Sequence, residues 1–110
     1  MYEIRYYETA DGHSPFAEWF EELDSVTRAR VAAAIARMEQ GNLSRVKSVG
    51  EGVLEYKMDF GPGYRVYFGR DGEQLVVLLT GGTKQRQQRD IKDAAAFWRD
   101  YKRSKRTIRR

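Results

Sequence analysis

The chain has 110 residues, of which 41% are hydrophobic and 13% aromatic, which is enough for one compact domain spanning 1–110. It contains no cysteine, which excludes disulfides, a thiolate nucleophile and a zinc–thiolate site. It has no apolar run of roughly 18 residues and no apolar leader segment, so we expect a cytoplasmic protein without a membrane span. Residues 1–83 carry 9 basic and 13 acidic side chains, whereas residues 84–110 carry 11 and 3. This asymmetry favours an anionic partner.

The hydrophobic pattern predicts an α+β domain with the element order β-α-α-β-β-β-α, in which a mainly antiparallel sheet packs against a helical hairpin. Residues 2–7 alternate as a strand, and Ser14-Pro15 is a typical helix start. A second helix begins at Asp24 or Ser25 and ends at Gly41. The residues expected on its buried side are Val26, Ala29, Ala33, Ala34, Ile35 and Met38.

The second half of the chain predicts a β-hairpin, a central strand and a last helix. Residues 42–52 are expected to be a loop, and residues 54–60 and 64–70 alternate on either side of a Gly-Pro-Gly turn. Their apolar face belongs to the core, and their polar face is expected to be exposed. Residues 75–79 are apolar on both faces, which predicts a strand that is covered on both sides. Residues 84 to about 105 have helical composition.

The polar face of the hairpin carries side chains that suit a phosphodiester. A turn centred on Pro62 places Asp59 opposite Arg65 and Lys57 opposite Tyr67. Arg65 suits a phosphate clamp, and cationic neighbours, Lys84 among them, are expected to lower the pKa of Lys57 so that it accepts a proton. Tyr67 offers a ring for base stacking. These roles fit a metal-free RNA cleavage in which the substrate's 2′-hydroxyl attacks the adjacent phosphate, although the same pattern also fits an exposed salt-bridge lattice without chemistry.

No metal or cofactor site is indicated. The single histidine lies in a predicted loop, and no cluster of His, Asp and Glu has the spacing of a metal site. The sequence also lacks a Walker A motif and a dinucleotide-binding glycine motif, so we expect neither a metal nor an organic cofactor.

Two blocks of the sequence resemble a known toxin family. They are DFGPGYRVYF at 59–68 and VLLTGGTKQRQ at 77–87, followed by Asp90-Ile91. Together they resemble the "addiction module killer protein" group of the RelE/ParE superfamily, which is related to HigB-type toxins. The resemblance implies a RelE-like fold, a ribosome-dependent mRNA endonuclease, and a cognate helix-turn-helix antitoxin beside the ribosome and mRNA as partners. It assigns the phosphate-contacting arginine to Arg65, and the two basic residues beside it to Lys57 and Lys84.

The late part of the chain departs from RelE, which places an arginine and a tyrosine acid there. Here a basic helix follows, and it suggests additional RNA contacts from Arg86, Arg89, Lys102 and Arg103. Residues 103–110 are expected to be a mobile basic tail. Two alternatives stay open, a ParE-like toxin that inhibits gyrase by binding and a non-catalytic module that binds RNA or an antitoxin.

Overall fold

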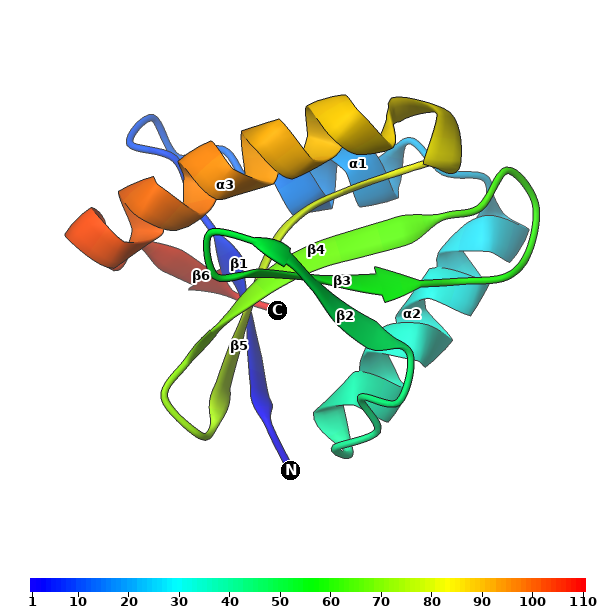
Figure 1. Ribbon diagram of the computed structural model, residues 1–110, viewed down its shortest axis with the longest axis horizontal. Coiled ribbons are helices and arrows are strands. Elements are labelled where there is room, and N and C mark those ends of the chain that lie inside the picture. The colour runs from blue at the N-terminus through cyan, green and yellow to red at the C-terminus, as the bar shows by residue number, and fades with distance from the viewer.

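The computed structural model describes all 110 residues and has three α-helices and six strands (Figure 1). The strands are β1 (Glu3–Tyr7), β2 (Val46–Gly50), β3 (Val53–Lys57), β4 (Arg65–Asp71), β5 (Leu75–Gly82) and β6 (Thr107–Arg109). The helices are α1 (Pro15–Glu21), α2 (Ser25–Glu39), the short 3₁₀ helix η1 (Lys84–Arg86) and α3 (Gln87–Ser104). None of these helices combines the length and the apolar content needed to cross a membrane.

All six strands form one sheet in the order β2-β3-β4-β5-β1-β6. Only β1 and β5 pair in parallel, and every other neighbouring pair is antiparallel. This mixed sheet with its three helices confirms the predicted α+β class. The prediction missed the two edge strands, β2 and β6.

The helices cover both faces of the sheet. The larger core, in which Phe16 of α1 and Met38 of α2 are fully buried, lies on one face. The second core lies on the other face and includes Trp98 of α3. Figure 1 shows α3 running along one side of the strands, with α2 on their other side. Consequently the central strand β5 is buried on both faces, as predicted.

The first two helices begin where the sequence predicts. The Ser14 side chain accepts a hydrogen bond from the backbone N–H of Ala17 at 3.1 Å, and Pro15 occupies the first helical position. The Asp24 carboxylate accepts one from the N–H of Thr27 at 3.2 Å. These caps satisfy N–H groups that lack a partner within the helix.

Helix α2 is rotated relative to the prediction. Its Ala34, Ile35 and Met38 are buried as expected, but Ala29 and Ala33 are exposed and Val26 is 65% exposed. Alanine fits either side of a helix, so its position in the sequence does not determine which face is buried. The solvent side of α2 therefore carries apolar side chains.

The register of the hairpin differs from the prediction by two residues. Lys57 pairs with Arg65 and Glu55 with Tyr67. The N–H of Met58 donates to the carbonyl of Tyr64 at 2.9 Å in the same register, so the hairpin is centred on Gly61 rather than Pro62. Because the shift is an even number, each side chain still points to the predicted face.

The C-terminal residues 103–110, expected to be mobile, have defined contacts in the structure. Ile108 of β6 pairs with Tyr6 of β1, and Arg106 Nη2 lies 2.8 Å from an oxygen of Asp100. Arg110 Nη2 lies 2.9 Å from both carboxylate oxygens of Glu39. Composition alone does not predict this strand, because its pairing with β1 is a long-range contact.

Candidate functional site

The three residues predicted to be catalytic lie at one end of the sheet, beside the β3–β4 turn. Lys57 and Arg65 are directly opposite each other on β3 and β4. The backbone N–H of Lys84 donates to the carbonyl of Pro62 at 3.3 Å, which connects η1 to the turn. A Cβ on Gly63 would lie 3.0 Å from Arg65 Nη1 and 3.2 Å from Lys84 Cβ. The fold thus brings together three basic residues, the first and last of which are 27 positions apart in the sequence.

Arg65 is buried rather than exposed. Only 4% of the residue is accessible, because α3 covers this face of the sheet. Its Nη1 donates to the carbonyl of Gly63 at 2.7 Å, and its Nε lies 3.6 Å from Oε2 of Glu55. Glu55 is itself fully buried and accepts a hydrogen bond from Gln87 Nε2 of α3 at 2.8 Å. The guanidinium is therefore held in one orientation by a buried carboxylate and a backbone carbonyl.

Tyr67 is also buried, so the predicted stacking surface is wrong. Its ring is completely inaccessible, and burial, followed by the nearby Glu55 carboxylate, raises the pKa of its hydroxyl. Asp90 of α3 is nearly as buried, and loss of hydration raises the pKa of its carboxyl above the usual value.

Beneath the start of α3 lies a cluster of buried polar side chains that are not fully hydrogen-bonded. Five buried side-chain polar atoms in the molecule lack a hydrogen-bond partner, and four of them belong to Glu55, Arg65, Tyr67 and Asp90. Native proteins leave few such atoms, so their concentration in one place marks it as unusual. We call these four residues the buried polar cluster.

Lys57 and Lys84, by contrast, are exposed beside this cluster. Lys57 Nζ lies 3.8 Å from Oδ1 of Asp59, whose other oxygen accepts a hydrogen bond from Arg45 Nη1 at 2.6 Å. That hydrogen bond is the main reason that the pKa of Asp59 lies below its usual value. Asp59 therefore interacts with Arg45 and Lys57, and not with Arg65 as the predicted register implied.

The other residues predicted to contact RNA fall into two separate groups. Arg86 is the last residue of η1 and Arg89 lies in the first turn of α3, so both are close to Lys84 in sequence. Lys102 and Arg103 lie near the end of the same helix, about 22 Å away from its start at the normal rise per residue. The structure therefore joins only the first pair to the three basic residues at the turn.

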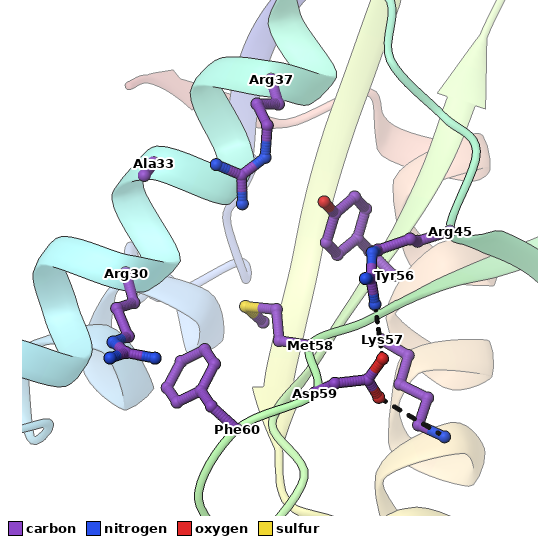
Figure 2. Close-up of a pocket in the computed structure, with 9 residues that line it drawn as sticks. All are labelled: Arg30, Ala33, Arg37, Arg45, Tyr56, Lys57, Met58, Asp59 and Phe60. Atoms are coloured by element: carbon purple, nitrogen blue, oxygen red, sulfur yellow. Dashed lines mark hydrogen bonds and ion pairs between the residues drawn. The ribbon is translucent and has the colours of Figure 1, made fainter.

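A groove of about 290 Å³ opens between α2 and the end of β3 (Figure 2). Arg30 and Arg37 of α2 form one wall, and Arg45 lies across from them, while Lys57 borders the groove with its ammonium directed away from α2. Its full lining is Arg30, Ala33, Arg37, Arg45, Tyr56, Lys57, Met58, Asp59 and Phe60. We call this the basic groove. Sequence analysis missed it, although the two arginines lie seven residues apart and therefore share one side of α2.

Sequence comparisons identify relatives of this chain. An uncharacterised protein of Haemophilus influenzae is 41% identical over 80 residues, which is 72% of this chain and 81% of that protein. The model of the phage-derived Gp49-like protein family (DUF891) matches residues 18–102, which include the buried polar cluster, the β3–β4 turn and the basic groove. The chain therefore belongs to the phage-derived Gp49-like family, a toxin-like, RelE-like family of the type II toxin–antitoxin kind.

Proposed function

We propose that this protein is a bacterial toxin that stops growth by cleaving mRNA on the translating ribosome, without a metal ion, in the cytoplasm. The observation that carries the proposal is the convergence of Lys57, Arg65 and Lys84 at the β3–β4 turn. The family supports a toxin with an antitoxin partner. A helix-turn-helix antitoxin, the ribosome and mRNA are the partners that this proposal adds.

The chemistry uses the nucleophile that RNA already contains. The 2′-hydroxyl attacks the adjacent phosphorus, a new P–O2′ bond forms, and the P–O5′ bond breaks. Lys57 takes the proton of the 2′-hydroxyl, and Lys84 gives a proton to the departing 5′ oxygen. The Arg65 guanidinium, oriented by Glu55 and the Gly63 carbonyl, stabilises the charge that develops on the phosphate.

The burial of Arg65 favours a second candidate, a toxin that inhibits DNA gyrase by binding alone. A guanidinium of which so little is accessible must gain exposure before it contacts a phosphate, whereas inhibition by a protein surface has no such requirement. The two candidates make different predictions for the RNA of poisoned cells.

Induced expression in a bacterial host, with mapping of mRNA 5′ ends, distinguishes these functions. The variants are Lys57→Ala and Lys84→Ala, and the matched control is Lys92→Ala, an exposed lysine of α3 without an ion pair. We expect new 5′ ends within translated reading frames, and a loss of cleavage of about 10²-fold or more in either variant but not in the control.

Other outcomes would contradict the proposal in distinct ways. Growth arrest with intact mRNA and impaired DNA supercoiling would replace it with gyrase inhibition. Full cleavage by both soluble lysine variants would reject the assigned residues. Normal growth despite soluble wild-type protein would reject the toxin function itself.

A further inference from the structure

The basic groove carries more positive charge than its own acidic residue neutralises. Four basic side chains line it, and Asp59 is its single carboxylate. Arg45 and Lys57 both interact with Asp59, at 2.6 and 3.8 Å. Arg30 and Arg37 form no ion pair within 4.0 Å, and Arg30 instead lies over the ring of Phe60, 4.8 Å from its centroid. The α2 wall therefore has two uncompensated positive charges.

The spacing of these two charges fits a helical partner. Arg30 and Arg37 are two turns apart on α2, about 10.5 Å along its axis. Acidic residues seven positions apart on another helix have the same separation. A helix aligned with α2 in the groove would therefore present two carboxylates to both arginines at once.

The surface around the arginines is apolar. Met58 and Tyr56 form a buried floor, and Ala33 lies exposed between the two arginines. The exposed Ala29 and Val26 continue this surface along α2, and Val26 is one of only three large hydrophobic side chains in the molecule that are exposed. Small side chains allow a second helix to approach closely, and an apolar strip flanked by charge is what an amphipathic helix contacts.

Nucleic acid fits this groove less well. Base stacking needs a free aromatic face, but Tyr56 is buried and Arg30 covers the ring of Phe60. Nor does a nucleic acid backbone gain from the exposed apolar side chains of α2. Charge and apolar surface together therefore favour a protein.

We infer that the basic groove is the docking site of an acidic, amphipathic helix from a partner protein. Figure 2 shows Lys57 leaving the end of β3 with its ammonium directed away from Arg30 and Arg37, so a helix seated against α2 would lie beside this residue and not over it. The docking itself follows from the groove.

The test is a selection of random 16-residue peptides displayed on phage against the wild-type protein. Binding of the selected peptides is then measured by fluorescence anisotropy on the wild type and on Arg30→Glu/Arg37→Glu. The matched control is Lys92→Glu/Arg109→Glu, which reverses two exposed basic residues without ion pairs on α3 and β6. It changes the net charge equally and lies on other elements.

We expect acidic peptides with apolar residues at helical spacing, and an affinity loss of about tenfold or more in the groove variant but not in the control. Failure to enrich such peptides, or equal losses in both variants, would overturn the inference. A 12-nucleotide polyuridine that binds the wild type, and loses affinity only in the groove variant, would reassign the groove to RNA.

The proposed function is tested separately in the same variants. Cleavage of mRNA by Arg30→Glu/Arg37→Glu together with loss of peptide binding supports both ideas. Peptide binding by a wild-type protein that cleaves no mRNA would leave the docking site standing and reject only the nuclease.

Discussion

Arg65→Ala is expected to lower the free energy of unfolding by about 3 kcal/mol. The substitution leaves the fully buried Glu55 carboxylate without the guanidinium 3.6 Å away, and breaking a buried ion pair in this way costs about 3–5 kcal/mol. The exposed Lys47, whose Nζ lies 3.8 Å from the other Glu55 oxygen, offers partial compensation, so we expect the lower end of that range. Gln87 retains its hydrogen bond to Glu55 and limits the loss further.

Urea unfolding followed by circular dichroism at neutral pH measures this loss. The matched control is Arg70→Ala on the same strand, because Arg70 is exposed and its guanidinium only stacks on Tyr2 at 4.9 Å. We expect less than about 1 kcal/mol there. The double variant Glu55→Leu/Arg65→Met removes both charges together and should be as stable as the wild type or more stable, as such replacements often are.

A loss below about 0.5 kcal/mol in Arg65→Ala would contradict this prediction, because it would mean that Glu55 needs no buried partner. So would a double variant that is less stable than Arg65→Ala alone. The expected loss also affects functional tests, since absence of toxicity in Arg65→Ala can follow from unfolding. The exposed Lys57 and Lys84 are therefore the cleaner probes of chemistry.

Three further predictions concern the core and the C-terminal contacts. Phe16→Ala should lower the free energy of unfolding by about 3–5 kcal/mol in the same urea assay, because the ring is fully buried. Gly82→Ala should lower the melting temperature and yield less soluble protein, since a Cβ there would lie 1.8 Å from Oδ2 of Asp90. The Tyr7 hydroxyl donates a hydrogen bond of 2.6 Å to the Asp100 carboxylate, and this bond is the main reason that the pKa of Asp100 lies below its usual value. The stability that Asp100 contributes is therefore present above the unfolded-state pKa of about 4 and is lost as pH falls through the lower folded-state pKa. Asp100→Asn should flatten the fall in melting temperature over this acidic range.

The larger features of the fold follow from local patterns in the sequence. Ser14-Pro15 marks the start of α1 because its hydroxyl and ring suit a helix N-terminus, whatever the helix packs against. The alternation around the β3–β4 turn assigns each side chain to the correct face, even though the register is shifted by two residues. Strand β5 was predicted to be covered on both sides because it is apolar on both. Each of these features depends on residues close in sequence.

The exposure of the site could not be predicted in the same way. Alternation shows that Glu55, Arg65 and Tyr67 share a face, but not that a helix some 20 residues later covers that face. The sequence did contain one signal that this face is covered. Strand β5 was predicted to be covered on both faces, and a helix that covers its second face also covers the same face of its neighbour β4. The strands β2 and β6 were missed for a related reason. Both are short edge strands whose pairing depends on the completed sheet.

The toxin resemblance rests on two sequence blocks, at 59–68 and 77–87. In the structure, some of their residues shape the site, and others are available for chemistry. Gly63 has a positive φ of 77° and lies against Arg65 and Lys84, so its role is to allow a close turn. Gly82 leaves room for Asp90, which explains why a glycine before η1 and an acid on α3 occur together. Neither glycine has a side chain that acts on a substrate. Of the basic residues in this motif, Arg65 is buried and is oriented by Glu55 and the Gly63 carbonyl, whereas Lys84 is exposed to solvent. Replacing Lys84 therefore disturbs the fold less, and a test of catalysis should begin with it.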